Sequence, residues 1–233
     1  MWICIGLMIA AAILLVFYLL EKCKRFSLKG VLLKTGISLL FIAVATSAML
    51  QKEQHVLNGF IIAGLIFGLL GDIFLDLKFV YPKDDKIYTY SGFAVFGIGH
   101  IFFVTGMFLE YYGDTNPLLL LIPILGSITF AGAVVLLAKP LKLDYKDLKI
   151  VVIAYALLLA WTPLTALMLS ISTLWSVPTL TTIFVGGVLF VISDLVLSGT
   201  YFGEGKNRPI DYVLNYLTYY GAQFVIAFSL FFI

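Results

Sequence analysis

Stretches of about 20 apolar residues recur along the chain and are separated by short polar segments. Twenty residues of α-helix rise about 30 Å, the thickness of the hydrocarbon core of a bilayer. The pattern therefore predicts membrane-spanning helices. Pro123 and Pro163 fall inside two of them and are expected to kink those helices, which membrane proteins tolerate. Eight helices are predicted, over residues 2–20, 30–50, 57–78, 90–110, 117–138, 149–170, 178–200 and 211–233.

The basic residues alternate between successive connections. All 15 Lys and Arg residues except Lys34 and Lys52 lie in or beside the connections that follow the first, third, fifth and seventh predicted helices. Cytoplasmic loops are rich in Lys and Arg, so these four connections are predicted to be cytoplasmic and both termini extracytoplasmic. Residues 2–20 lack a basic leader and a small-residue cleavage site, and are expected to be a retained helix.

Composition supports the same class. The chain is 62% hydrophobic and 12% charged, whereas soluble domains are about 45–50% apolar and about 25% charged. We therefore expect one all-α polytopic domain over residues 1–233, in the cell membrane and among its lipids. The net charge of +2 gives no reason to expect a nucleic-acid partner. Cys4 and Cys23 form neither a disulfide framework nor a CxxC metal motif. The oligomeric state cannot be read from the sequence.

Two helices in opposite halves resemble each other. GLIFGLLGDIFLD, residues 64–76, aligns with GGVLFVISDLVLS, residues 186–198, which pairs Asp72 with Asp194. Basic connections follow the first and fifth predicted helices at similar offsets. These matches raise the hypothesis of a parallel repeat of four plus four helices.

Asp72, Asp76 and Asp194 are the acidic residues that lie well inside predicted spans. A charged side chain at the bilayer centre costs about 2.5–3.5 kcal/mol on insertion scales, so the three must be offset by partners or by water. Gly64, Gly68, Asp72 and Asp76 recur every four residues and share one helix face. The glycines allow close approach of a neighbouring helix, and the acids are then expected to face the bundle interior.

A second stripe with the same spacing occurs in the last predicted helix, and a histidine lies within the fourth. These residues, with Asp76, are predicted to line a polar pocket in the cytoplasmic half of the bundle around Asp72 and Asp194. The stripe and the histidine are Asp211, Asn215, Tyr219, Gln223 and His100.

Structural roles remain open for the same residues. Asp72 and Asp194 could cap backbone groups or pair with Asn and Tyr across helices. Asp76 could anchor Lys78 or meet water near the interface, and His100 could be a packing residue. The stripe on the last helix is more typical of a pocket wall than of reacting groups, although Gln223 could orient a water.

Other chemistries have little support. No GxSxG motif is present, and the two histidines belong to no cluster such as HExxH, so no metal or other cofactor is expected. GTYFGEGKNRP, residues 199–209, departs from a phosphate-binding loop at Thr200 and Asn207. Gly68-Leu-Leu-Gly-Asp72 is one residue longer than the GxGD motif of intramembrane aspartyl proteases.

Four ordered motifs resemble one family of membrane proteins. GLLGDIFLD, FAVFGIGHIFF, GGVLFVISDLVL and YYGAQFVIAF are similar, in order and spacing, to the YhhN-like lysoplasmalogenase family. The resemblance implies eight spans and hydrolysis of the vinyl-ether bond of lysoplasmalogens, giving a fatty aldehyde and glycerophosphoethanolamine or glycerophosphocholine. It also implies an acid–base pair at Asp72 and Asp194, but it assigns no role to Asp76.

The residues suit that reaction. A vinyl ether hydrolyses when an acid protonates its carbon and water captures the resulting oxocarbenium ion, so one carboxyl must be protonated and a second ionised, as in glycosidases. We expect Asp194 to be the acid and Asp72 the base, although the sequence does not assign them. A small-solute or proton-coupled transporter is the alternative function, and a non-catalytic lipid-binding or scaffold protein is a third.

Overall fold

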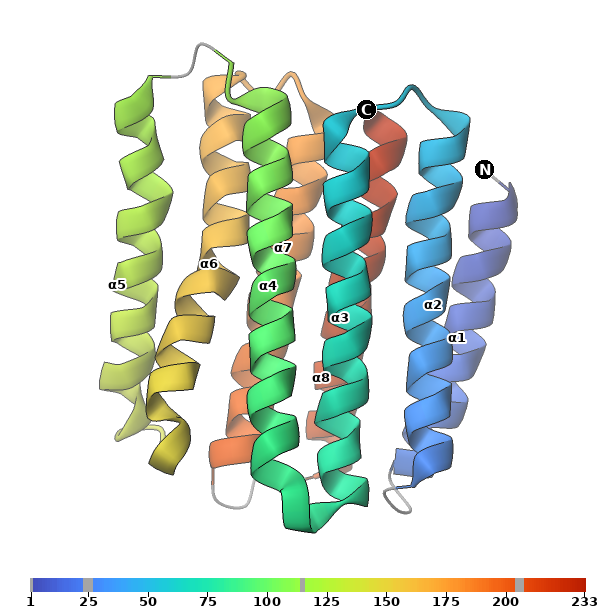
Figure 1. The fold of residues 1–233 in the computed structure, drawn as a ribbon, viewed down its shortest axis with the longest axis vertical. Coiled ribbons are helices and arrows are strands. Elements are labelled where there is room, and N and C mark those ends of the chain that lie inside the picture. The colour runs from blue at the N-terminus through green and yellow to red at the C-terminus, as the bar shows by residue number, and fades with distance from the viewer. Residues whose placement is uncertain (1, 23–26, 114–115, 204–207) are drawn as a thin grey trace.

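The computed structural model describes residues 2–22, 27–113, 116–203 and 208–233. These residues form eight α-helices, four short 3₁₀ turns and no β-strand (Figure 1). Three residues of the predicted basic connections, Lys24, Arg25 and Lys206, lie outside the described residues. The helices are α1 (Trp2–Lys22), α2 (Leu28–Gln51), α3 (Val56–Val80), α4 (Asp85–Tyr111), α5 (Leu121–Ala138), α6 (Lys149–Ser172), α7 (Pro178–Phe202) and α8 (Pro209–Phe228).

Seven helical segments among the described residues are long and apolar enough to cross a membrane, and they contain α1 to α7. Together they indicate a multi-pass membrane protein. Helix α8 is not among them, because Asp211, Asn215 and Gln223 interrupt its apolar sequence. The helix ends lie within about five residues of the predicted ones.

Local sequence explains where several helices begin and bend. Ser27 caps α2 by accepting a hydrogen bond from the backbone N–H of Gly30 at 3.2 Å, which satisfies one unpaired donor of the first turn. Pro163 lies inside α6, and this helix changes direction along its length (Figure 1). The predicted kink at Pro123 is wrong. This proline is the third residue of α5, where its missing N–H removes no helical hydrogen bond.

The helices run alternately up and down (Figure 1). The start of α1 and the end of α8 lie at one end of the bundle. The ends of α1, α3, α5 and α7 and the starts of α2, α4, α6 and α8 lie at the other end. The described basic residues of the predicted cytoplasmic connections therefore gather at one end, which we call the basic end. Large apolar side chains such as Leu32, Leu50 and Leu136 are more than two-thirds exposed on the outer surface, as a lipid-facing surface requires.

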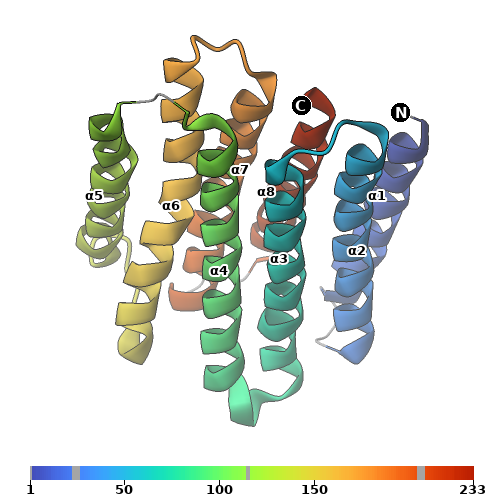
Figure 2. The same cartoon turned by 45° about the horizontal axis from the view of Figure 1, so that its top comes forward.

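Helix contacts follow the same pattern in both halves of the chain. In the first half α1 packs on α2, α2 on α3 and α3 on α4, and in the second half α5, α6, α7 and α8 pack in the same order. Across the halves α4 packs on α6, and α8 packs on α2. Helices α1 and α5 form opposite edges of the bundle in both views (Figures 1 and 2). These are the contacts that a four-plus-four repeat requires.

The contacts also define two groups of four helices, one built around α2 and the other around α6, which are joined by extensive packing of α3 on α4 and of α7 on α8. One group contains α1, α2, α3 and α8, and the other contains α4, α5, α6 and α7. Each group combines three helices of one half with the last helix of the other. The polar network described next lies within the first group, and a small pocket beside it lies where the two groups meet.

Candidate active site

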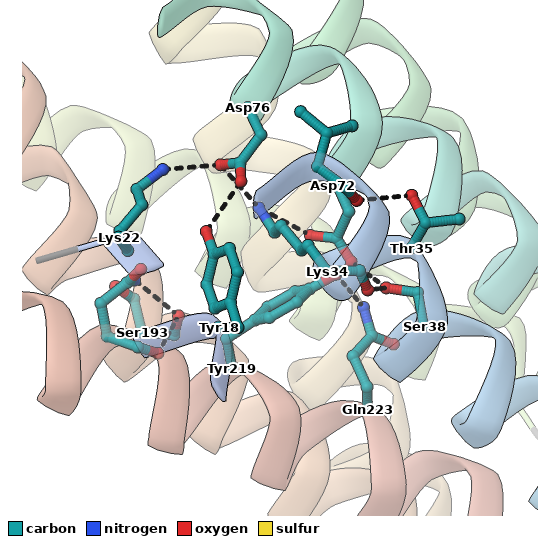
Figure 3. Close-up of polar contacts among 12 residues, drawn as sticks. Tyr18, Lys22, Lys34, Thr35, Ser38, Asp72, Asp76, Ser193, Tyr219 and Gln223 are labelled. Carbon is teal, nitrogen blue, oxygen red and sulfur yellow. Dashed lines mark hydrogen bonds and ion pairs between the residues drawn. The ribbon is translucent and has the colours of Figure 1, made fainter. Parts of the chain in front are cut away.

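Two buried carboxylates on α3 share one lysine. Asp72 and Asp76 lie one helical turn apart, and Lys34 of α2 approaches both, with its Nζ 3.1 Å from Asp72 Oδ1 and 3.5 Å from Asp76 Oδ1 (Figure 3). All three side chains are almost fully buried. The positive charge of Lys34 therefore lies beside the negative charges of both carboxylates, which offsets part of the free-energy cost of burying them.

Helix geometry explains why these groups meet. Lys34 is the seventh residue of α2, and Asp76 and Asp72 lie four and eight residues before the end of α3. At 1.5 Å per residue these positions all lie about 6–12 Å from the basic end. Because α2 and α3 pack side by side in opposite directions, the lysine and the two acids come to the same depth.

The same spacing recurs on every helix of this group. Each of α1, α2, α3 and α8 contributes two polar side chains four residues apart, which places the pair on one helix face. Together they form a continuous buried polar network at the centre of the group (Figure 3). The pairs are Tyr18 and Lys22, Lys34 and Ser38, Asp72 and Asp76, and Tyr219 and Gln223.

Asp72 receives two hydroxyl donors as well as the lysine. Ser38 Oγ donates to Asp72 Oδ2 at 2.6 Å, and the Tyr219 hydroxyl donates to the same oxygen at 2.8 Å. Gln223 Nε2 donates in turn to the Tyr219 hydroxyl at 3.0 Å. Gly68 leaves room for this amide, because a Cβ at that position would lie 2.9 Å from Gln223 Nε2. Two hydroxyl donors and a cation hold Asp72 as an oriented carboxylate.

Asp76 has different partners. Lys22 Nζ donates to Asp76 Oδ1 at 2.8 Å, and the Tyr18 hydroxyl donates to Oδ2 at 2.8 Å. The sequence left open an ion pair with Lys78 or contact with water, but the structure instead joins Asp76 to α1 and, through Lys34, to α2. Asp76 is not in the lining of the pocket described below, so its contacts fasten three helices together.

Asp194 of α7 lies in a less polar setting. Its Oδ2 accepts a hydrogen bond from the hydroxyl of Tyr155 on α6. Its side chain is half-buried, whereas Asp72 is 1% exposed. Lys34 approaches Asp72, but no lysine of the described residues forms an ion pair with Asp194. The two aspartates that align in sequence therefore have unlike environments.

Asp72 and Asp194 line the same small pocket. It encloses about 20 Å³ between the two helix groups, which exceeds the roughly 10–15 Å³ that one water molecule needs. The polar groups around it come from α2, α3, α6, α7 and α8, so a water there would find several hydrogen-bonding partners. These polar residues are Lys34, Asp72, Tyr155, Ser193, Asp194, Tyr201, Asn215, Tyr216 and Tyr219.

A much larger apolar cavity adjoins this pocket. It encloses about 360 Å³ among α4, α5, α6 and α7, and side chains such as Phe130, Ala156 and Leu159 form its walls. Asp194 and Tyr155 line both spaces. The carboxyl of Asp194 therefore stands at the boundary between an apolar chamber and a water-sized polar pocket.

Other predicted pocket residues are distributed unevenly. Asn215 and Tyr219 line the small pocket, and Asn215 Nδ2 also donates to the backbone oxygen of Ser193 at 2.9 Å, which fixes α8 beside Asp194. Gln223 does not line the small pocket, but it donates a hydrogen bond to the hydroxyl of Tyr219, which does. His100 is absent from the lining of the small pocket and of the apolar cavity. Its Nδ1 lies 2.9 Å from Thr162 Oγ1.

The partners of the carboxylates were not predicted from the sequence. From the sequence, Lys22 is interpreted only as an orientation signal and Lys34 only as an exception to that pattern, and no role is predicted for Tyr18 or Tyr155. A signal for three of them was present, because Tyr18 with Lys22 and Lys34 with Ser38 show the same four-residue spacing that identified the stripes on α3 and α8. Tyr155 had no such signal, since its role depends on how α6 packs on α7.

The site shows no arrangement typical of a metal centre. Among the described residues, no three or more His, Cys, Asp or Glu side chains gather where they could hold a metal ion. Asp72 and Asp194 are instead engaged with hydroxyl and ammonium donors. Two carboxyls beside a pocket large enough for one water molecule are able to exchange protons with it.

An all-α bundle of apolar helices with a buried carboxylate centre defines this chain as a multi-pass membrane protein with an internal polar site. Comparison with family models places it more closely: the chain belongs to the YhhN family, whose model matches residues 29–230. The match covers most of the chain and includes Asp72 and Asp194. No curated protein and no solved structure matches the chain.

Proposed function

We propose that the protein is a vinyl-ether hydrolase of the lysoplasmalogenase type. One observation carries the proposal: Asp194 lines both the apolar cavity and the small polar pocket that Asp72 also lines. A lysoplasmalogen has an apolar alkenyl chain joined through a vinyl ether to a polar glycerophosphate. Its reactive bond therefore needs a site of this kind, where apolar space ends and a water-sized polar space begins. Membership of the YhhN family is compatible with this activity.

The alkenyl chain would occupy the apolar cavity. Its walls bury apolar methylene groups, at about 0.8 kcal/mol for each group, and they direct the double bond toward Asp194. The saturated portion of the chain needs no polar partner there. Binding of the alkenyl chain in the cavity would therefore set the position of the reactive carbon.

Asp194 would supply the first proton. Its neutral carboxyl donates a proton to the double-bond carbon next to the alkyl chain, and the ether oxygen stabilises the positive charge as an oxocarbenium ion. Tyr155 holds the carboxylate that remains. A half-buried carboxyl with one hydroxyl partner and apolar neighbours suits a general acid better than Asp72, which is beside a lysine.

Asp72 would activate the water. It accepts one proton as the water oxygen bonds to the oxocarbenium carbon, which gives a hemiacetal. Asp194 then takes the hemiacetal hydroxyl proton while Asp72 returns its proton to the leaving glycerol oxygen. One vinyl ether and one water give one aldehyde and one alcohol, and both carboxyls recover their starting states.

The proposal includes an orientation. Positively charged connections favour the cytoplasmic side, and Asp72 and Asp76 lie near the basic end. We therefore propose that all eight helices span the membrane, that both termini are extracytoplasmic and that the site opens in the cytoplasmic half. Lys52 lies between α2 and α3 and Lys83 between α3 and α4, in connections at opposite ends of the bundle (Figure 1). Labelling of Lys52→Cys from outside the cell and of Lys83→Cys from the cytoplasm alone would support this orientation, and the reverse pattern would contradict it.

The activity is tested with purified protein in lipid nanodiscs. Two substrates are compared, a 1-alkenyl lysophospholipid and its saturated 1-alkyl analogue, and released aldehyde is measured. We expect aldehyde from the vinyl ether alone. An Asp84→Asn variant serves as a matched control, because Asp84 is exposed at the basic end and lines neither the small pocket nor the apolar cavity.

Contrary results would be equally clear. Absence of aldehyde from the vinyl ether, in protein whose thermal unfolding is cooperative, would contradict the proposal. If the same protein then moved protons or a small solute across liposomes in a manner that depends on Asp72, the transporter alternative would replace it.

A further inference from the structure

Helix α5 stands at an edge of the bundle and forms one wall of the apolar cavity (Figures 1 and 2). It packs closely on α6, but it has no comparable packing on α7, which forms the wall across the cavity. The polar side chains of α5, Ser127 and Thr129, donate to backbone oxygens of their own helix at 2.6 and 2.8 Å. Polar side chains of α5 therefore do not fasten this helix to α7.

Three apolar residues of the cavity wall are also exposed on the outer surface. Leu137 near the end of α5, Leu141 in the connection that follows it, and Leu195 of α7 each line the cavity and are about half exposed. We call these three residues the rim. Leu195 directly follows Asp194 in the chain, so the rim extends to the depth of that carboxyl. An exposed apolar rim on a multi-pass protein is suited to contact with lipid.

The equivalent position in the first half of the chain is closed. The sequence alignment of α3 with α7 pairs Asp76 with Ser198. Asp76 binds the buried side chains of Tyr18 and Lys22 and so fastens α1 to α3, whereas Ser198 lines the apolar cavity. Lys22 is the last residue of α1 and is buried, but Lys139, which directly follows α5, is exposed. The ion pair that closes one half therefore has no counterpart between α5 and α7 in the described residues.

The connection from α5 to α6 covers the cavity at the basic end. The N–H of Asp144 donates to the backbone oxygen of Phe202 at 2.9 Å, and Leu143 forms an isolated β-bridge with Gly203. The buried ring of Tyr145 packs edge to face on Phe202, with ring centroids 5.0 Å apart. A hydrocarbon chain coming from water would have to pass these contacts, whereas a chain in the bilayer meets the rim and keeps its methylene groups out of water.

We propose that the gap between α5 and α7 is a lateral portal, through which the hydrocarbon chain of a bilayer lipid enters the apolar cavity directly from the membrane. The inference rests on the proposed function for the reaction at Asp194, and it adds the route by which the chain reaches that carboxyl. Asp194 lies eight residues before the end of α7, about 12 Å from the basic end. The portal therefore opens into the leaflet at that end.

The size of the cavity favours a lipid chain over a partner helix. An α-helix with its side chains is about 10–12 Å wide, so a space of about 360 Å³ would hold less than one turn of it. An aliphatic chain is narrow enough to enter lengthwise. The cavity also continues to Asp194 and Tyr155 at the small polar pocket, which gives an entering chain a defined end point.

Fluorescence quenching tests the portal without requiring hydrolysis. In protein whose Cys4 and Cys23 are replaced by Ser, a small fluorophore is attached to Ser198→Cys in lipid nanodiscs. We expect strong quenching by lipids with bromine on the chain and at least about tenfold weaker quenching by aqueous iodide. Lys83→Cys, exposed at the basic end, should show the reverse, and Leu136→Cys, exposed on α5, gives the reference for full lipid contact. Quenching of the Ser198→Cys label by iodide and not by lipid would overturn the portal in favour of an aqueous entrance.

Closing the rim tests the route itself. Leu137→Cys and Leu195→Cys, on opposite sides of the gap, are joined by a bis-methanethiosulfonate cross-linker that a reducing agent removes. A saturated 1-alkyl lysophospholipid with a photoreactive diazirine on its chain is then added, and its covalent capture by cavity residues is measured by mass spectrometry. We expect capture to fall at least about tenfold and to recover after reduction.

The two single-cysteine variants, treated with the same reagent, are the matched controls. They carry the added atoms but leave α5 and α7 unlinked, so their capture of the lipid should stay near that of untreated protein. Equal loss of capture in the single variants would overturn the proposal, because filling of the cavity would then explain the effect.

The failure of each proposal is distinguishable. Unchanged capture in fully cross-linked protein would overturn the portal, whether or not the protein releases aldehyde. Capture that the cross-link abolishes, in protein that releases no aldehyde from vinyl ethers, would support the portal and contradict the hydrolase.

Discussion

Asp72 and Asp194 reach one water-sized pocket from different helix groups, and they carry unlike partners there. Lys34 and two hydroxyl groups hold Asp72, whereas Asp194 has the Tyr155 hydroxyl and faces an apolar cavity. Because their environments differ, the two carboxyls are suited to opposite protonation states. This difference is the basis of the proposed acid and base.

Asp76 is expected to support the fold and not the reaction. Asp76→Asn would leave the buried Lys22 without its carboxylate, and removing one member of a buried pair costs about 3–5 kcal/mol. We expect a lower midpoint of thermal unfolding in detergent. The double variant Lys22→Met with Asp76→Asn should recover much of the lost stability and keep its rate of aldehyde release near wild type. A hundredfold slower rate in the stable double variant would place Asp76 in the chemistry.

Tyr155 is predicted to position Asp194. Tyr155→Phe keeps the ring that packs beside Phe93 and His100 and removes the hydroxyl that donates to Asp194. A hydrogen bond to a charged group is worth about 1.5–3 kcal/mol, so kcat should fall roughly 10- to 100-fold. KM should change little, because the apolar wall is preserved. A rise in KM with unchanged kcat would show that Tyr155 binds substrate and does not orient the carboxyl.

The apolar cavity predicts a dependence on chain length. Ala156 is buried in its wall, so Ala156→Phe would fill part of the 360 Å³ available to the chain. We expect kcat/KM to fall at least about tenfold for long alkenyl chains and much less for short ones, measured across a series of substrates. Gly132→Ala is the control variant, because nothing lies within 4 Å of the Cβ that it adds. An equal loss for every chain length would place the chain elsewhere.

Hydrolysis in heavy water should mark the protonated carbon. If Asp194 transfers a solvent-derived proton to the double bond, each aldehyde formed in D₂O carries one deuterium on the carbon next to the carbonyl group. Immediate reduction of the aldehyde, followed by mass spectrometry, measures this label and prevents later exchange. Aldehyde without deuterium would rule out carbon protonation, and a saturated aldehyde exposed to the same enzyme reports any background exchange.

Much of the fold follows directly from sequence. Apolar runs of membrane-spanning length gave helix ends within about five residues of those in the structure, because each run is bounded by charged or turn-forming residues. The kink at Pro123 was predicted wrongly because the apolar pattern placed the start of the helix at residue 117. The pattern does not show that Pro117–Leu120 forms a 3₁₀ turn and that α5 begins after it. The position of a helix start depends on such local geometry.

The candidate site was only partly predictable. The burial of Asp72 and the partial burial of Asp194 could be predicted from their place inside apolar runs. The four-residue spacing placed Asn215 and Tyr219 on the inward face of α8. The apolar cavity could not be foreseen, because its walls come from four helices whose packing no single run encodes. Lys34 was overlooked since a lysine near a helix end usually reaches the interface, whereas here two carboxylates retain it.

The central claim is that Asp72 and Asp194 act as one unit on the vinyl ether, and a double-mutant cycle measures this most directly. Aldehyde release is followed for wild type, Asp72→Asn, Asp194→Asn and the double variant, each in nanodiscs and with its cooperative unfolding verified. General acid–base groups contribute about 10²–10⁴-fold, and groups that act together are far from additive. We predict that each single variant loses at least about a hundredfold and that the double variant is no slower than the worse single one. A folded Asp72→Asn or Asp194→Asn variant that releases aldehyde at the wild-type rate would contradict the account.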